Sequence, residues 1–481
     1  MPMHTTFYIF VITNLAVVLG KEHENGIYEK GDIMIGGLFP VHEEGPGDSC
    51  GIKINPDRGI QRLEAMRFAV KSINENSDIL RGVTLGVHIL DTCSGGTQGL
   101  DQALSFVMST LDTKCEDDST APHNNDIVAV IGAAYSKVSI QIAHLLRLFE
   151  IPQISYASTS AELSDKDKFK YFMRTVPPDK LQANALKDIV EHLNWTYVST
   201  VASSGEYGVS GIEAFEREYV KSLGQCIATR EKVPQNPTEQ DFLTIIENLY
   251  AARNGRVVVL FTGQEDAGGI LRAATTKGYL DDFIWVASDG WGNSVKTVKD
   301  SKEAAQGALT LTLKSNPITE FDNYFTKLRP ENNKGNVWFH DYWESFFDCE
   351  IPHAEGHRLS HKHLYTTQAN SQSHGESQSP AYSLPPCDKQ HGHQIEHFSQ
   401  EAKIQFVYDA VYAVAIALDK IYREVCGNSA TKLCEELTFN NTFRQELMDR
   451  IKQHDKEGIL SYHTCRCPWF SLHVKHQSRQ L

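Results

Sequence analysis

After its first twenty residues the sequence has no long hydrophobic run, and it has no excess of positive charge. A membrane-spanning helix needs about 20 apolar residues in a row, so no further membrane span is expected. The 46 Lys and Arg residues face 61 Asp and Glu residues, which leaves a net charge of −15. A nucleic-acid scaffold, which needs a basic face, is therefore excluded. A small anionic ligand is not excluded, because a few arginines can dominate the field inside a cleft.

The chain also lacks GxSxG, HExxH, Walker A and paired CxxC motifs. These motifs mark hydrolase nucleophiles, zinc sites and phosphate-binding loops, so the sequence favours a binding protein over an enzyme and predicts no cofactor. Eight histidines lie within residues 351–400, and a metal-dependent hydrolase is the alternative that they raise. Their spacing does not repeat and the segment is polar and low in complexity, which favours a surface loop without metal.

The N-terminus predicts a signal peptide over residues 1–20, because the apolar run Phe7–Gly20 is followed by a polar segment. A buried strand or an uncleaved anchor is the alternative interpretation. Ten cysteines and two glycosylation sequons, at Asn194 and Asn440, fit passage through the secretory route and favour disulfides over cytosolic thiols. The sequence therefore predicts a secreted or extracellular glycoprotein.

From residue 32 onward, apolar segments alternate with amphipathic helical periods such as Ile60–Ile73 and Val138–Phe149. This alternation predicts an α/β fold with parallel sheets wrapped by helices. The strands are too many for one modest sheet, so we expect two lobes joined by a hinge, with a ligand between the carboxyl ends of facing strands. The predicted strands are Ile33–Phe39, Leu85–Leu90, Ile127–Ile131, Gln153–Tyr156, Tyr197–Ala202, Val257–Phe261, Ile284–Ala287 and Ala308–Leu313.

Four turns at strand ends carry unusual polar residues. The turns 132–136 and 155–160 hold small hydroxyl residues that can present Oγ and N–H groups to an anion, although plain N-caps are the alternative. In the turn 287–292, Asp289 either makes a tight turn or accepts hydrogen bonds from an ammonium group. In the turn 203–208, Tyr207 is flanked by glycines and is able to cover a ligand.

Two arginines, Arg58 and Arg62, precede and open the predicted helix Ile60–Ile73. A spacing of four places both side chains on one face, where like charges repel by a few tenths of a kcal/mol. An anion shared by the two side chains would offset this repulsion. A solvated basic face is an equally good interpretation.

Several segments together resemble metabotropic glutamate receptors, most closely the second group of that family. They include NPDRGIQRLEAMRFAVKSIN, EIPQISYASTSAELSDK, NWTYVSTVASSGEYG and WVASDGWG, within a collinear similarity from about residue 30 to about residue 455. The resemblance implies a bilobed clamshell of the type I periplasmic-binding-protein kind. Its expected parts are lobe 1 at 28–185 and 319–455, lobe 2 at 186–318, the histidine-rich loop at 351–400, and a divergent tail at 456–481.

The resemblance also implies a site for L-glutamate or a related acidic amino acid. Ser136, Thr159 and the Ser158 backbone would bind the α-carboxylate. Tyr207 would pack over the ligand from lobe 2, and Gly290 would permit close backbone approach. The groups implied for the ammonium are the Ala157 carbonyl, Thr159 and Asp289, with Asp179 nearby on the hinge side. The groups implied for the distal carboxylate are Arg58, Arg62 and Lys403.

By the same resemblance, ligand closes the clamshell of a homodimer that associates through lobe 1. Cys115 matches the family's intersubunit bridge, and Cys226 lacks its usual partner at the expected place. A G protein would be reached only through a membrane domain that this sequence does not contain. The implied disulfides are Cys50–Cys93, Cys349–Cys387 and Cys426–Cys434.

Three departures from the family pattern stand out. Gly263 occupies a position where the second group has an arginine that reaches the distal end of the ligand, and Ala134 replaces a serine of that group. After about Asp455 the final crossover into lobe 2 is expected to be lost, together with the cysteine-rich and membrane domains. The sequence therefore predicts a truncated receptor ectodomain, with a non-signalling secreted decoy subunit as the alternative.

Overall fold

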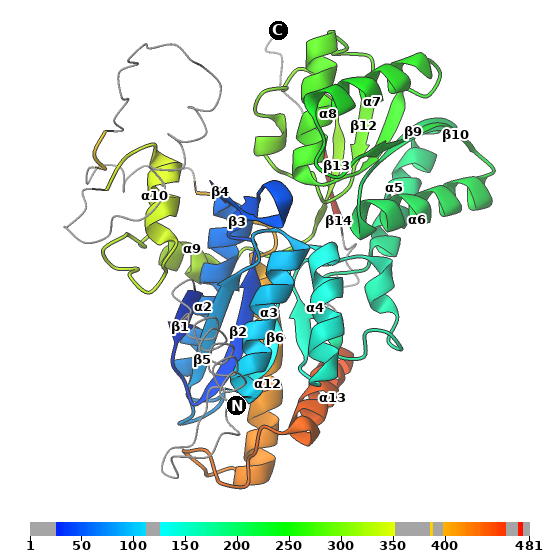
Figure 1. The fold of residues 1–481 in the computed structure, drawn as a ribbon. Coiled ribbons are helices and arrows are strands. Elements are labelled where there is room, and N and C mark those ends of the chain that lie inside the picture. The colour runs from blue at the N-terminus through cyan, green and yellow to red at the C-terminus, as the bar shows by residue number, and fades with distance from the viewer. Residues whose placement is uncertain (1–25, 112–125, 352–384, 388–397, 458–469, 475–481) are drawn as a thin grey trace, which may run out of the picture.

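The computed structural model describes residues 26–111, 126–351, 385–387, 398–457 and 470–474. These residues form two α/β lobes, each with a central sheet between layers of helices (Figure 1). The predicted fold class, with parallel strands wrapped by helices in two lobes, is confirmed. No helix in the described ranges is both long and apolar enough to cross a bilayer.

Lobe 1 is built on a six-stranded sheet in the order β1-β5-β2-β6-β7-β8. All neighbouring pairs are parallel except β1 with β5. In β2, Ile33 and Ile35 share a core with helices α2 and α12, whereas Met34 and Leu38 pack with α3 and α4. Because both faces are covered, these strands read as continuous apolar runs. The strands are β1 (Gly26–Glu29), β2 (Ile33–Phe39), β5 (Leu85–Asp91), β6 (Ile127–Ile131), β7 (Gln153–Ser155) and β8 (Phe172–Arg174).

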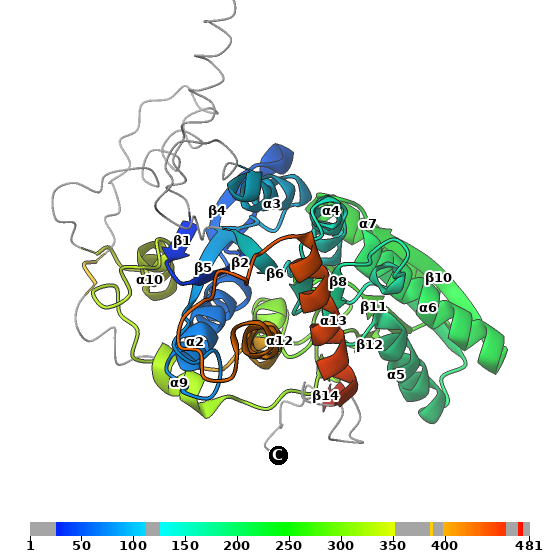
Figure 2. The same ribbon diagram turned by 90° about the horizontal axis from the view of Figure 1, so that it is seen from below.

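The helices of lobe 1 come from both halves of the chain. Figure 2, seen from below, shows α12 beside α2 with α13 close by, although more than 300 residues separate α2 from α12. A small hairpin of β3 (His42–Glu44) and β4 (Cys50–Ile54) leads into the helical turn η2 (Pro56–Gln61). The helices are α2 (Arg62–Asn74), α3 (Gly96–Leu111), α4 (Ser136–Leu148), α9 (Thr319–Phe325), α10 (Phe339–Phe347), α12 (Ile404–Cys426) and α13 (Asn441–Glu457).

Lobe 2 has a second six-stranded sheet, in the order β10-β9-β11-β12-β13-β14. Val258 and Leu260 of β11 pack with α7 and α8, and Val257 and Val259 pack with α5 and α6. The strands are β9 (Tyr197–Ser203), β10 (Cys226–Val233), β11 (Val257–Phe261), β12 (Ile284–Ala287), β13 (Leu309–Leu313) and β14 (Phe470–Val474). The helices are α5 (Asp179–His192), α6 (Glu206–Leu223), α7 (Glu239–Ala251) and α8 (Gln264–Lys277).

The C-terminal tail corrects one expectation. We predicted that the chain would not return to lobe 2 after about Asp455, but β14 pairs antiparallel with β13, from Leu309 opposite Val474 to Leu313 opposite Phe470 (Figure 1). The segment FSLHV alternates apolar and polar residues, which is the period of a strand with one buried face. The β13 edge of the lobe 2 sheet is therefore paired in the described structure.

The three predicted disulfides, Cys50–Cys93, Cys349–Cys387 and Cys426–Cys434, are confirmed. Among the described residues, Cys226 is a free and exposed thiol. The predicted signal peptide at 1–20, the predicted intersubunit Cys115 and most of the histidine-rich loop at 351–400 lie outside the described residues. The exact lobe boundaries stay a prediction.

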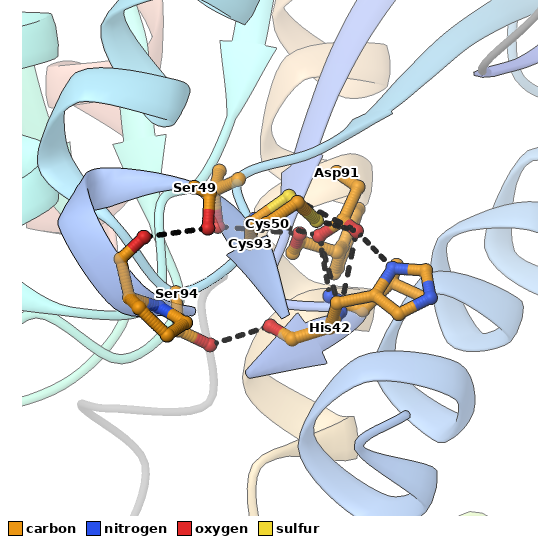
Figure 3. Close-up of a disulfide and its surroundings, with 10 residues drawn as sticks. His42, Ser49, Cys50, Asp91, Cys93 and Ser94 are labelled. Atoms are coloured by element: carbon orange, nitrogen blue, oxygen red, sulfur yellow. Dashed lines mark hydrogen bonds and ion pairs between the residues drawn. A yellow bond between two sulfur atoms is a disulfide. The ribbon is translucent and has the colours of Figure 1, made fainter. Parts of the chain in front are cut away.

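The first disulfide fastens the strand ends that lead to the site (Figure 3). At the end of β5, the Asp91 carboxylate accepts hydrogen bonds from the backbone N–H groups of Val41, His42 and Cys93. Its Oδ2 atom also lies 2.6 Å from Nδ1 of His42 and 3.7 Å from the Cys50 sulfur. These bonds anchor the β3–β4 hairpin to the sheet, and that hairpin positions the turn η2.

Candidate ligand-binding site

The predicted site residues converge where the two lobes meet, at strand ends and helix starts, as expected of parallel α/β sheets. A cavity of about 170 Å³ there is lined by both lobes. Lobe 1 contributes Arg58, Arg62, Glu401 and Lys403, and lobe 2 contributes Gln264, Asp289 and Trp291. Four of the eleven predicted ligand-binding residues line this cavity, namely Arg58, Arg62, Asp289 and Lys403.

Arg58 joins the two lobes directly. It lies in η2, where the Asn55 side chain caps the turn by accepting a hydrogen bond from the Arg58 backbone N–H at 3.4 Å. The Arg58 Nη2 atom donates to the backbone carbonyl of Gly290 in lobe 2 at 2.9 Å. The guanidinium therefore already bonds across the cleft and stands at the cavity wall.

Arg62 is the first residue of α2, is only 3% exposed, and has a carboxylate partner that the sequence analysis missed. Its Nε and Nη2 atoms donate to the two carboxylate oxygens of Glu401 at 2.9 and 2.7 Å. Burial alone would raise the pKa of Glu401, but the Arg62 charge and these hydrogen bonds hold that pKa below its usual value. The pair is thus ionised and bidentate.

Lys403 precedes α12 and forms the second ion pair of the cleft, this time between lobes. Its Nζ atom lies 2.8 Å from Oδ2 of Asp289, and the side chains are 16% and 4% exposed. Gln182 and Tyr207 donate to the other oxygen of Asp289, at 3.1 and 2.8 Å. Burial would raise the pKa of Asp289, but the Lys403 charge and these hydrogen bonds keep that pKa below its usual value.

Asp179, the first residue of α5, is the opposite case. Its side chain is fully buried, and within the described residues its Oδ2 atom has no hydrogen-bond partner. Burial, and next the negative charge of Asp289, raise the pKa of Asp179 to about 8, although a hydrogen bond with the Thr159 side chain opposes the shift. Asp179 therefore keeps its proton at neutral pH unless a cation comes close enough to favour the charged form.

The predicted carboxylate cradle is made of buried hydroxyl residues that already bond to one another. The Ser158 N–H donates to Oγ of Ser155 at 2.9 Å, and the Ser158 hydroxyl bonds to the Ala133 carbonyl at 3.2 Å. Oγ of Ser136 accepts from the backbone N–H of Ser160 at 3.2 Å. Ala157 and Thr159 are buried in the same turn. A ligand carboxylate would therefore have to share or replace these internal bonds.

Tyr207 and Gly290 support the Asp289 turn from within lobe 2. The Gly290 N–H donates to the Tyr207 hydroxyl at 3.1 Å. A Cβ atom on Gly290 would lie only 2.1 Å from the Thr262 carbonyl oxygen, so only glycine fits. Gly290 thus lies close to a neighbouring strand end of its own lobe, and its place beside a ligand stays a prediction.

Sequence reasoning missed Glu401 and Gln182. Glu401 lies two residues before Lys403, but nothing local shows that it pairs with an arginine 339 positions away. One group in the described residues has the geometry of a metal site, namely His42, Cys50 and Asp91. Because the Cys50 sulfur is bonded to Cys93, this group is not an available set of metal ligands.

Residues 61–460 match the family described as receptor family ligand binding region. The chain belongs to this family. The match covers most of both lobes, and it accounts for the bilobed fold and for the position of the cleft. As a receptor ligand-binding region, the chain is a binding protein and not an enzyme.

Known relatives within this receptor family are metabotropic glutamate receptors. The chain is 44% identical to the metabotropic glutamate receptor of Drosophila melanogaster over 417 residues, which cover 84% of the chain and 42% of the relative. It is 40% identical to human metabotropic glutamate receptor 8 over 430 residues, covering 88% and 45%. The mouse receptor 8 is 41% identical over the same length. The predicted relationship is confirmed, and the chain spans less than half the length of these relatives.

Proposed function

We propose that this chain binds an acidic α-amino acid, L-glutamate foremost, in the cleft between its lobes. The observation that carries the proposal is a pair of neighbouring acids, Asp289 and Asp179, which share Gln182 as a hydrogen-bond donor; Asp289 lines the same cavity as Arg58, Arg62 and Lys403. An acidic amino acid has one ammonium and two carboxylates. The cleft offers the ionised Asp289, with Asp179 close to it, for the ammonium, and Arg58, Arg62 and Lys403 together with buried hydroxyl groups for the two carboxylates.

The contacts between lobes support closure as the response to ligand. Arg58 and Lys403 of lobe 1 bond to Gly290 and Asp289 of lobe 2. A ligand shifts an equilibrium only by contacts that it makes better in one state than in the other. A ligand lodged between these residues would touch both lobes only when the cleft is closed, so it would favour the closed form.

An apolar stripe on α3 supports association of two copies through lobe 1. Leu100, Leu104 and Met108 follow one another at a spacing of four and are 38%, 44% and 37% exposed. Leu148, at the end of the neighbouring helix α4, is 74% exposed. We name Leu100, Leu104, Met108 and Leu148 the α3 patch. An exposed apolar patch of this kind marks an interaction surface.

An extracellular location and glycosylation at Asn194 and Asn440 belong to the same proposal. Both asparagines are exposed, as carbohydrate attachment requires. Asn194 lies in the turn between α5 and β9. Asn440 precedes α13, where its side chain accepts a hydrogen bond from the Phe443 N–H at 3.0 Å. Peptide mapping of the secreted protein before and after glycosidase treatment would detect carbohydrate at these positions.

The proposal is tested by calorimetric titration with L-glutamate and with glutarate, which lacks the ammonium group. The wild-type protein is expected to bind glutamate more tightly than glutarate. Asp179→Asn should weaken glutamate binding on the order of 10- to 100-fold, the value of a charge-assisted hydrogen bond, and leave glutarate binding unchanged. Arg62→Ala should weaken both ligands, because both carry the distal carboxylate.

Circular dichroism of each variant provides the control for folding. Absence of glutamate binding by a folded wild-type protein would reject the proposed function. Equal losses for glutamate and glutarate in Asp179→Asn would keep the ligand class but remove Asp179 from the ammonium site.

A further inference from the structure

Four cations line the cavity, and each already has a partner within the chain; Lys296 lies 3.8 Å from Asp57. Arg62 is paired with Glu401, Arg58 donates to the Gly290 carbonyl, and Lys403 is paired with Asp289. Two of these partners differ in how readily they can be replaced. The Arg62–Glu401 pair is bidentate and lies within lobe 1, where the Glu401 backbone N–H also donates to the Gln61 side chain at 3.0 Å.

The Lys403–Asp289 pair is easier to exchange. A lysine ammonium is a compact charge on a flexible stem, and it makes one contact here, at 2.8 Å, with a single oxygen of Asp289. That oxygen belongs to the acid which, under the proposed function, receives the ligand ammonium. The lysine and the ligand therefore compete for the same carboxylate, and the ligand must displace Lys403 to bind there.

Displacement leaves the Lys403 ammonium without a counter-ion. Its side chain is 16% exposed, and removing the partner of a largely buried charge is strongly unfavourable. The other acids near the cavity do not readily replace Asp289: Glu401 is held in the bidentate pair with Arg62, Asp57 lies 3.8 Å from Lys296, and burial keeps the pKa of Asp179 raised to about 8. A distal carboxylate on the ligand, placed at the cavity wall beside Lys403, would supply the anion.

We propose that the Lys403–Asp289 ion pair is a selectivity device that works by exchange of partners. The ligand ammonium takes Asp289, and the released Lys403 takes the distal carboxylate of the ligand, so one pair is replaced by two. A neutral amino acid breaks the same pair but has no distal carboxylate to bind Lys403. Two effects therefore disfavour neutral amino acids. They must break the Lys403–Asp289 ion pair without replacing it, and they lack the attraction between Lys403 and a distal carboxylate.

This inference rests on the proposed function. A single variant distinguishes a failure of the partner exchange from a failure of glutamate binding. Lys403→Met keeps about the length of the side chain and removes the charge, while Asp289 keeps the hydrogen bonds from Gln182 and Tyr207; circular dichroism checks that the variant folds. The probes are L-glutamate and L-glutamine, which differ only at the distal group. Lys403→Met should bind glutamate more weakly but glutamine more tightly, on the order of tenfold, because glutamine no longer has to break an ion pair. Lys299→Met, at an exposed lysine outside the cavity, is the matched control and should change neither affinity.

The affinity of Lys403→Met for glutamine is the decisive measurement. If Lys403 only attracted the distal carboxylate, the substitution would weaken glutamate and leave glutamine unchanged, and that result would overturn the exchange while the proposed function stands. A wild-type protein that binds no glutamate would overturn both. Lys403→Gln serves as a second variant with the same expected directions, should Lys403→Met fail to fold.

Discussion

At the scale of single residues, the cleft holds two aspartates with opposite properties. Asp289 has Lys403 as a partner and its pKa is held below the usual value, whereas Asp179 has no charge partner close enough to offset burial and its pKa is raised to about 8. The difference comes from the environment, because the residue type is the same. Asp179 thus takes its proton or a cation, and Asp289 remains charged.

The raised pKa of Asp179 predicts a pH dependence of stability. Between about pH 4 and pH 8 the folded chain keeps a proton on Asp179 that the unfolded chain has lost, so the contribution of this residue to the free energy of unfolding falls as pH rises through this window. Above about pH 8 the contribution is constant. Urea unfolding of the wild type and Asp179→Asn should show a difference in stability that moves in favour of the variant from pH 5 to pH 8. A difference that is independent of pH would contradict the assigned protonation.

At the scale of elements, a buried carboxylate ties helix α2 to the second half of the chain. Glu64 is fully buried in α2 and accepts hydrogen bonds from Arg67 at 2.9 Å, from Tyr324 at 2.7 Å, and from Asn333 and Asn336 at 2.7 Å each. Every one of these donors except Arg67 lies more than 250 positions away. The network therefore holds the return segment against the helix whose first residue is Arg62.

Removal of the positive partner should destabilise this junction. We expect Arg67→Ala to lower the free energy of unfolding by about 3–5 kcal/mol, because it leaves the Glu64 charge buried without a counter-charge. Arg272→Ala is the matched control: its ion pair with Glu239 is exposed, with side chains 44% and 68% accessible, and should contribute about 0–1 kcal/mol. Chemical denaturation of both variants tests this. Equal effects would mean that the three remaining hydrogen bonds, from Tyr324, Asn333 and Asn336, hold the junction without the charge of Arg67.

At the scale of the whole molecule, the two lobes are linked by the polar contacts of the cleft, and the α3 patch offers an apolar surface on lobe 1. The separation of these features suits a receptor region in which ligand acts between the lobes and association involves one lobe. Under the proposed function, closure would change the relation between two copies without breaking a contact at the α3 patch.

The α3 patch predicts the oligomeric state. Sedimentation of the reduced protein should show a dimer that Leu104→Asp converts to monomer, because the substitution places a charge in the centre of the apolar stripe. Leu193→Asp, at a leucine of lobe 2 with nearly the same exposure (42% against 44%), should leave the dimer intact. A wild-type monomer, or a dimer that tolerates Leu104→Asp, would contradict this assignment. Non-reducing gels of Cys115→Ser test the predicted covalent bridge separately.

Sequence alone determined the interior strands of both sheets. Runs such as Ile127–Ile131 and Val257–Phe261 were predicted with the bounds that the structure has, because burial on both faces requires consecutive apolar residues. The edge strand β10, with the sequence CIATREKV, was missed, since a partly exposed edge carries charges and loses that signal. The tail strand β14 was missed because its pairing partner lies about 160 positions earlier.

For the candidate site, the sequence determined which turns hold the polar and charged groups, since the strand ends of a parallel sheet lie at one edge. Only the tertiary structure decided their partners and their charge states. The Arg62–Glu401 and Lys403–Asp289 pairs join residues 339 and 114 positions apart, and no local pattern encodes such contacts. The raised pKa of Asp179 likewise depends on burial and on the nearby charge of Asp289, which come together only once the chain has folded.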